Sequence, residues 1–189
     1  MRDAEIGYFQ PDLPKSYSRD DPVTMGQDCF FRNVYAFVDR VKDVAAYRGE
    51  EQVKARLPAL LRGSAQLWYT SSLDSLAKDG LRHTPGLGHW FKILEEQFRQ
   101  PLQQSLSALS TTRYTYQDAI KRRPFLRYVA EMQLHARNAG FTDKTMQLTY
   151  AYSGMDTGLK KTMPEPTKEM SAQDFIRFAD AQKQDWVDI

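Results

Sequence analysis

The stretch Leu57-Pro-Ala-Leu-Leu-Arg-Gly-Ser-Ala-Gln-Leu-Trp-Tyr69 predicts one helix that ends at Gly63 and a second that starts directly after it. Glycine favours such a stop because it adopts the left-handed backbone conformation without a Cβ clash. A second aromatic stretch, His89-Trp-Phe-Lys-Ile-Leu-Glu-Glu-Gln-Phe98, has apolar residues at helical spacing. Together the two stretches predict short helices whose aromatic side chains face one small core.

The composition is that of a globular protein and argues against disorder throughout the chain, because 41% of the residues are hydrophobic and 12% are aromatic. A length of 189 residues allows one domain or two small ones. The 26 basic and 24 acidic residues nearly cancel, which leaves a formal net charge of +2. No strong overall field therefore draws the chain to nucleic acid or anionic lipid, although a local basic patch remains compatible with this balance.

A metal centre and a disulfide framework are both disfavoured. Cys29 is the single cysteine, and the three histidines, His83, His89 and His135, lie too far apart for a zinc knuckle. We expect no cofactor and no metal. The N-terminus has no apolar leader, and no apolar run approaches the ~18 residues of a membrane span. We therefore expect a cytoplasmic protein that does not bind membranes.

Residues 1–26 are expected to form an extended N-terminal arm. Three prolines and two glycines with polar residues between them favour turns and extended backbone over helix. Four side chains in this arm are apolar enough to dock on a surface of the same molecule or of another copy, and docking on its own domain is the simpler interpretation: Ile6, Tyr8, Phe9 and Leu13.

Residues 27–100 are predicted to form a first helical domain. An apolar stripe with Asp28 as its N-cap predicts a helix that extends to Ala45. Three more helices are predicted after it: Glu50 to Leu61 with a kink at Pro58, Ser64 to Leu76, and a helix after the Pro85 turn that carries Phe91, Leu94 and Phe98.

Residues 101–189 are predicted to form a second helical domain, which begins at Pro101 because the residue before a proline is pushed out of helical backbone space. Strand-like alternation is essentially missing from the chain. The fold class is therefore all-α, with two small helical bundles in tandem. The helices expected in the second half are Leu102–Leu109, Tyr116–Ile120, Pro124–Asn138, Thr142–Tyr152 and Ser171–Trp186, the last opened by a capping box.

This layout resembles the capsid region of Gag polyproteins from gypsy-type LTR retrotransposons, including those of fungal genomes. The N-terminal capsid domain of that family looks like a long first helix, a leucine-rich helix, a Gly-Ala-x-x-Trp-Tyr joint and a Trp-x-x-Phe/Leu-x-x-x-Phe helix. The matching segments here are Phe30–Tyr47, Leu57–Leu61, Gly63–Tyr69, which reads Gly-Ser-Ala in place of Gly-Ala-Ala, and Trp90–Phe98.

The second half resembles the C-terminal capsid domain of the same family. Pro124-Phe-Leu-Arg-Tyr-Val-Ala-Glu-Met132 is similar to the major homology region of retroviral capsids. The glutamine that the family places shortly before this phenylalanine would be Gln117, but Lys121-Arg-Arg123 lengthens the spacing. This departure bears on the buried polar network of the motif.

The resemblance implies a structural protein, not an enzyme, that associates with itself into virus-like particles enclosing RNA. It also implies that N-terminal domains pack side by side in rings and C-terminal domains pair between rings. From helix order alone, we expect the ring contact on the outer face of the first helix, at Arg32, Asn33, Asp39, Arg40 and Asp43. The pair contact is expected on the Thr142–Tyr152 helix, at Met146, Thr149 and Tyr150.

A basic cluster is the best candidate for an RNA contact: Arg113, Lys121, Arg122, Arg123 and Arg127, with Tyr114, Tyr116 and Tyr128 interleaved. Cationic side chains neutralise phosphates, and tyrosines stack on bases. The favoured alternative is a solvated helix junction with core tyrosines. In the family, most RNA packaging resides in a basic or zinc-knuckle tail beyond the capsid, and we expect such a tail to lie outside these residues.

Two other functions stay open. One is a domesticated Gag-derived helical adaptor that binds a peptide or protein partner, in a groove where its own arm could lie. The other is an enzyme, for which Asp156-Thr-Gly158 matches the triplet of aspartic proteases. That triplet requires two carboxylates held together in a β-rich dimer. Because the residues that follow it look helical, a turn between helices is the preferred interpretation.

Overall fold

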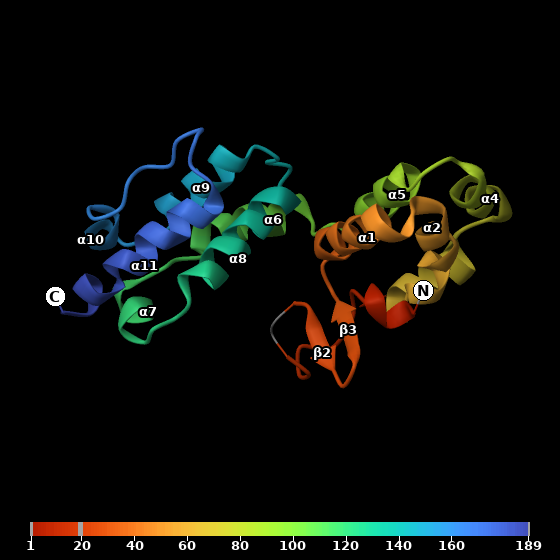
Figure 1. Ribbon diagram of the computed structural model, residues 1–189, viewed down its shortest axis with the longest axis horizontal. Helices are drawn as coiled ribbons and strands as arrows, with labels where there is room; N and C mark the ends of the chain where they lie inside the picture. Colours follow the sequence, from red (N-terminus) through yellow and green to blue (C-terminus); the bar gives the residue numbers. More distant parts are fainter. Residues whose placement is uncertain (1, 19–20, 189) are drawn as a thin grey trace. The chain divides into compact units, whose positions relative to one another are not determined.

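The computed structural model describes residues 2–18 and 21–188, with only the backbone at 184, 187 and 188. The chain divides into two compact units, residues 1–99 (unit 1) and residues 100–189 (unit 2). Both are built mainly of helices (Figure 1). The protein is therefore predominantly helical, as the sequence predicts.

The helices of unit 1 follow the predicted order with shifted ends. Gly63 opens a helix instead of ending one, because Leu61 and Arg62 are extended and pair with the N-terminal segment, where Arg62 N donates to Phe9 O at 2.8 Å. The elements are a 3-10 turn η1 (Asp3–Glu5), α1 (Val34–Arg48), α2 (Glu50–Leu60), α3 (Gly63–Leu67), a π-helical turn η2 (Trp68–Ser72), α4 (Ser75–His83) and α5 (Gly88–Phe98).

The predicted third helix, Ser64 to Leu76, is wrong near its C-terminal end, where the helical backbone stops after Ser72. The backbone leaves helical space at Leu73 after the π-helical turn, and α4 starts afresh two residues later. Asp74 caps this new helix, since its carboxylate accepts a hydrogen bond from Ala77 N at 2.8 Å. A good N-cap residue in the middle of an apolar helical pattern therefore marks a restart.

A small sheet corrects two further predictions, the absence of strands and the helix start at Asp28. Strand β3 (Asp28–Phe31) lies between β1 (Tyr8–Phe9), which is parallel to it, and β2 (Val23–Met25), which is antiparallel. Aromatic residues pack well on a pleated sheet, and the two phenylalanines of β3 join it instead of extending the helix. The N-cap of helix α1 is Asn33, whose side chain accepts from Ala36 N, so the cap lies five residues after the predicted cap Asp28.

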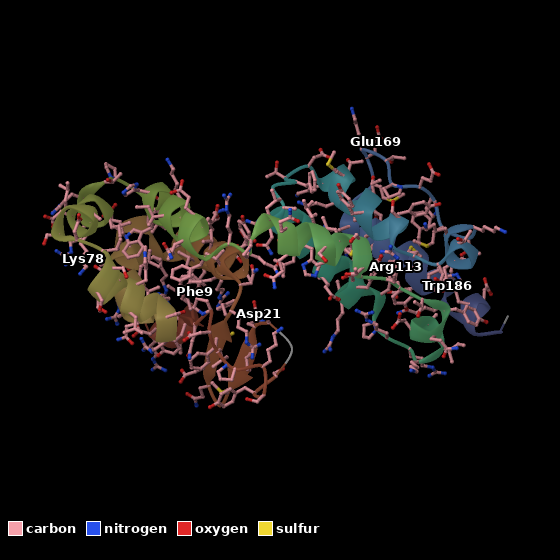
Figure 2. All side chains as sticks on the ribbon, turned by 180° about the vertical axis from the view of Figure 1, so that it is seen from behind. Phe9, Asp21, Lys78, Arg113, Glu169 and Trp186 are labelled. Carbon is pink, nitrogen blue, oxygen red and sulfur yellow. The ribbon has the colours of Figure 1, made fainter. Side chains whose placement is uncertain are left out.

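The N-terminal segment is part of the core of unit 1, so it docks on its own unit. Ile6 and Phe9 are fully buried. The Phe9 ring stacks on Phe37, with 5.1 Å between centroids, and meets the edge of Phe98 at 5.2 Å. Figure 2 shows Phe9 among the side chains that fill this unit.

Unit 2 matches the predicted helices closely. The Ser171–Asp174 capping box is confirmed, because the Ser171 hydroxyl bonds the Asp174 carboxylate at 2.6 Å and accepts from Asp174 N at 3.1 Å. Helix α8 contacts both α6 and α9, and α11 contacts α7 and α8. The helices are α6 (Leu102–Thr111), α7 (Tyr116–Ile120), α8 (Phe125–Asn138), α9 (Lys144–Ser153), a short α10 (Thr157–Lys160) and α11 (Ala172–Asp188).

The core of unit 2 is aromatic, with Tyr114 at its centre. The Tyr114 ring contacts Phe125, Tyr128 and Trp186, with centroids 5.0, 5.4 and 6.2 Å away. All four residues are fully buried, and Trp186 (Figure 2) also donates its indole N–H to Thr162 Oγ1 at 2.8 Å. The segment before α7 is thereby fixed against α8 and α11.

We expect Gly63→Ala to destabilise unit 1 more than Gly26→Ala does. Both glycines have positive φ, +53° and +63°, so any side chain costs about 1–2 kcal/mol at either position. Only at Gly63 would the added Cβ also collide with the Asp12 carboxylate, which accepts from Ser64 N at 3.0 Å, whereas nothing lies within 4 Å at Gly26. Urea unfolding of the two variants measures the difference.

Equal destabilisation by the two alanines would contradict this account. The double variant Asp12→Ala/Gly63→Ala provides the control, because it removes the collision. We expect it to recover part of the loss in unfolding free energy relative to the sum of its single variants.

Candidate functional site

Three of the five residues expected at the ring contact bind inside unit 1. The Arg32 guanidinium donates to Leu13 O and Pro14 O, each at 2.8 Å. The Arg40 guanidinium donates to Glu5 O, and Asn33 caps α1. The two arginines thus fasten the N-terminal segment and Asn33 caps the helix, so these side chains do not form an open patch on the outer face of α1.

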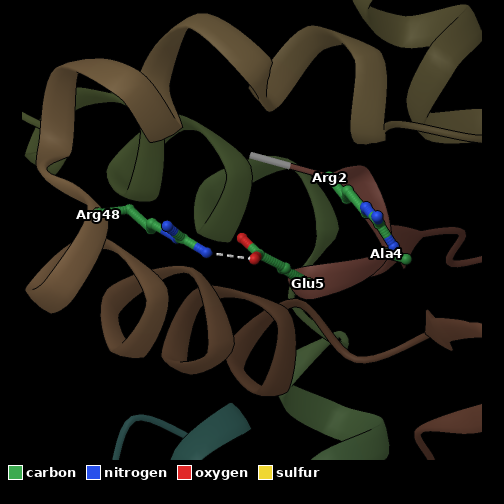
Figure 3. Close-up of a pocket in the computed structure, with 4 residues that line it drawn as sticks. All are labelled: Arg2, Ala4, Glu5 and Arg48. Carbon is green, nitrogen blue, oxygen red and sulfur yellow. Dashed lines mark hydrogen bonds and ion pairs between the residues drawn. The ribbon is translucent and has the colours of Figure 1, made fainter.

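Further arginines continue this fastening along the segment. Arg48 forms an ion pair with Glu5, Arg56 lies 3.4 Å from the Asp3 carboxylate, and the Arg62 guanidinium lies 4.3 Å from the Tyr8 ring centroid. The pair of Arg48 and Glu5 lines a cavity of about 490 Å³ together with Arg2 and Ala4 (Figure 3). The cavity lining thus consists of the edge of the docked segment and one ion pair.

Asp39 and Asp43 remain toward solvent on α1. Asp39 lies 3.9 Å from the Lys42 ammonium, and Asp43 is exposed. The Lys42 ammonium also lies over the Phe91 ring of α5, 5.3 Å from its centroid. A cavity of about 280 Å³ lies at this place, and no single stretch of sequence indicates it because its lining comes from three separate elements: Lys42, Ala45, Ala46, Glu50, Leu87 and Phe91.

Helix α9 carries the three residues expected at the pair contact. Met146 is 45% exposed, Thr149 is exposed, and Tyr150 is half-buried against Phe141, with 5.1 Å between ring centroids. The opposite side of the helix enters the core through Gln147, Leu148 and Ala151. Residues 145–155 contain no charged side chain. The outer side of α9, which we call the α9 face (Met146, Thr149 and Tyr150), is therefore neutral and partly apolar.

The basic cluster is divided by an ion-pair network. Arg123 lies 3.5 Å from the Asp118 carboxylate and 2.9 Å from the Glu131 carboxylate, and Glu131 also faces His135 at 3.8 Å. Asp118 in turn forms a capping box with Thr115 at the start of α7. Arg123 is thus part of the junction between α7 and α8, while Lys121, Arg122, Arg113 and Arg127 are exposed.

This network lowers the pKa of both carboxyl groups. For Asp118, burial raises the pKa, but hydrogen bonds from Thr115 and the charge of Arg123 outweigh it, so the pKa lies below its ordinary value. For Glu131, the hydrogen bond from His135 is the main cause of a lowered pKa, which Arg123 lowers further against the effect of burial. The charged forms of both residues are stabilised in the folded protein.

Two of the three tyrosines in the cluster are core residues, as the alternative interpretation predicts. Tyr114 and Tyr128 are fully buried. Their hydroxyls donate to the carbonyls of Arg123 at 2.9 Å and Ala151 at 2.6 Å, and burial raises the pKa of both phenols. Their rings are therefore not available for stacking on nucleic-acid bases.

The Asp156-Thr-Gly158 triplet forms a turn and the start of a short helix. The Asp156 carboxylate accepts from Tyr116 N at 2.8 Å, and Thr157 and Gly158 begin the short helix α10. Within residues 2–18 and 21–188, no group of three or more His, Cys, Asp or Glu side chains is placed to hold a metal ion.

Burial raises the pKa of the Cys29 thiol. None of the helices described is both long and apolar enough to cross a membrane.

No protein-family model, curated protein or solved structure matches this chain.

We expect acid to remove part of the stability of unit 2 through Glu131. Since its folded pKa is lowered, its contribution is present at neutral pH and is lost as the pH falls from about 4.5 through the folded value. Glu131→Gln is expected to destabilise the protein by up to about 1 kcal/mol at pH 7, a value limited by partial exposure of the ion pair. At pH 3 the unfolding free energies of the variant and the wild type should become similar.

Urea unfolding at pH 7 and pH 3 measures this effect. Glu169→Gln is the matched control, because Glu169 is exposed and has no ion pair among the described residues. A Glu131→Gln difference that stays the same at both pH values would refute the assignment.

Proposed function

We propose that this chain is a structural protein that associates with copies of itself, as a capsid domain of a gypsy-type retrotransposon Gag, into cytoplasmic particles that enclose RNA. The observation that carries the proposal is the neutral α9 face. The family resemblance of the sequence supports it with the order of its helical landmarks. In this proposal the protein has no catalytic activity.

The lack of charge on the α9 face suits contact with an identical copy. A two-fold interface places the same patch on both partners, so a charge near the axis faces a like charge. The core of protein interfaces is depleted of charged residues and enriched in methionine and tyrosine. Met146 and Tyr150 provide these residue types next to Thr149, on the side of α9 opposite the residues that enter the core.

The small size of this face fits assembly into a large particle. One exposed methionine and a half-buried tyrosine support only a weak pairwise contact. Weak contacts suffice in a closed shell, because each chain binds several neighbours and the contacts act together. On its own, the isolated pair should dissociate readily on dilution.

A peptide-binding adaptor is the second candidate, and the docked N-terminal segment favours it. This segment reaches unit 1 through strand pairing of Tyr8 and Phe9 with β3 and through the arginine contacts. A surface that holds an extended peptide in this way is a form of β-strand addition. A protein that stays monomeric at every concentration, with and without RNA, would favour the adaptor.

We expect Met146→Asp to abolish concentration-dependent association. The substitution places two negative charges across a two-fold axis in an interface that has none, and it removes the apolar contact. Size-exclusion chromatography with light scattering over a range of protein concentrations measures the effect. Negative-stain imaging of early fractions identifies particles.

Phe178→Asp is the matched control on α11, because Phe178 is 47% exposed and Met146 is 45% exposed. We expect this control to associate like the wild type. Loss of association in both variants, or in neither, would overturn the role of the α9 face. Circular dichroism of both variants establishes that each remains folded.

A further inference from the structure

The connection between α8 and α9 has a fixed backbone. Gly140 has φ of +89°, in the left-handed region, and Phe141 N donates to Ala136 O at 2.9 Å. Gly140 N also donates to Arg137 O at 3.0 Å, which completes the hydrogen-bond pattern of a Schellman motif at the end of α8. Phe141, the residue after the glycine, therefore has a defined place where the chain leaves α8.

Phe141 is joined to the next helix, α9, which packs against α8 (Figure 1). The side-chain amide of Gln147 donates to Phe141 O at 2.8 Å. The Phe141 ring lies against the Tyr150 ring, with 5.1 Å between centroids and 34° between the ring planes. Gln147 is buried and Tyr150 is half-buried, so Phe141 lies at the border between the core side of α9 and the α9 face.

This ring contact restricts the Tyr150 side chain. Both rings are partly buried and pack against the core of unit 2. An aromatic pair at this separation is attractive beyond the area that it buries. A tyrosine on a helix surface without such a neighbour samples several rotamers, and Phe141 removes part of this freedom before any partner binds.

A side chain that is already ordered binds a partner at a lower cost in entropy. Tyrosine is enriched among the few residues that provide most of the binding energy at protein interfaces. Of the three residues that form the α9 face, Tyr150 is the one with a rigid ring, and that ring is the one in contact with Phe141.

We infer that Phe141 is a positioning residue of the α9 face, which holds the Tyr150 ring in the orientation that meets a second copy of the chain. This role rests on the proposed function, in which the α9 face is the contact between copies. Phe141 lies nine positions before Tyr150 and outside α9, so helical spacing in the sequence does not link the two residues.

We expect Phe141→Leu to raise the dissociation constant for self-association about tenfold, because a two-fold contact contains the Tyr150 ring twice and both rings lose their support. Phe141→Tyr keeps the ring, and its added hydroxyl reaches solvent from a half-buried position, so this variant should associate like the wild type. Light scattering over a dilution series measures the dissociation constants, and circular dichroism establishes that each variant remains folded.

A double-mutant cycle with Tyr150→Leu distinguishes positioning from a general effect on the fold. If Phe141 acts through Tyr150, Phe141→Leu should raise the dissociation constant of the wild type but leave that of Tyr150→Leu unchanged. Equal increases in both backgrounds would give Phe141 a merely structural role and overturn the inference.

Phe178→Leu is the matched control, because it makes the same substitution at an exposed ring on α11. It should leave the dissociation constant at the wild-type value. An unchanged dissociation constant in Phe141→Leu, an equal increase in Phe178→Leu, or a comparable increase in Phe141→Tyr would each overturn the role of Phe141.

The proposed function and the role of Phe141 fail in different ways. A wild type that stays monomeric at every concentration would overturn the proposed function and the role of Phe141 with it. Association that Met146→Asp abolishes but Phe141→Leu leaves unchanged would support the α9 face and overturn the role of Phe141 alone.

Discussion

An extended segment without a helix must find partners for its backbone elsewhere, and this requirement organises unit 1. Residues 2–14 meet it through strand pairing with β3, a bridge to Leu61, and guanidinium groups that bind backbone carbonyls. Phe9 then enters the core between Phe37 and Phe98. Arg32 and Arg40, which a sequence pattern assigns to the outer face of the first helix, are consequently used to hold this segment.

The same use of charge in unit 2 decides which surfaces remain for partners. Arg123 joins α7 to α8 through Asp118 and Glu131, and the neighbouring Lys121 and Arg122 are exposed. Helix α9 has an outer face without charged side chains, on which Met146 and Thr149 are exposed while Tyr150 packs against Phe141. Unit 2 thus uses Arg123 within its own fold and leaves part of the α9 face exposed to solvent.

The sequence predicted those parts of the fold that depend on neighbouring residues. Helices of unit 2 were placed well because their caps are local, as with Ser171 and Asp174. The sheet was missed, since Tyr8 and Phe9 pair with strand residues far along the chain. The role of Arg40 was missed for the same reason, because its partner Glu5 is 35 positions away. In the basic cluster, composition showed the cations, but only the geometry separated Arg123 from the others.

The position of Phe9 also bears on how unit 1 forms during synthesis. Its ring touches Phe98, so one core contact spans almost the whole unit. Contacts between residues that are distant in sequence form late and slow the folding of small domains. On the ribosome, the residues around Phe9 emerge before α5 and must wait for the end of that helix before this core can close. Until then their apolar side chains stay exposed. Where several copies are synthesised close together, exchange of N-terminal segments between chains can compete with correct folding during this interval.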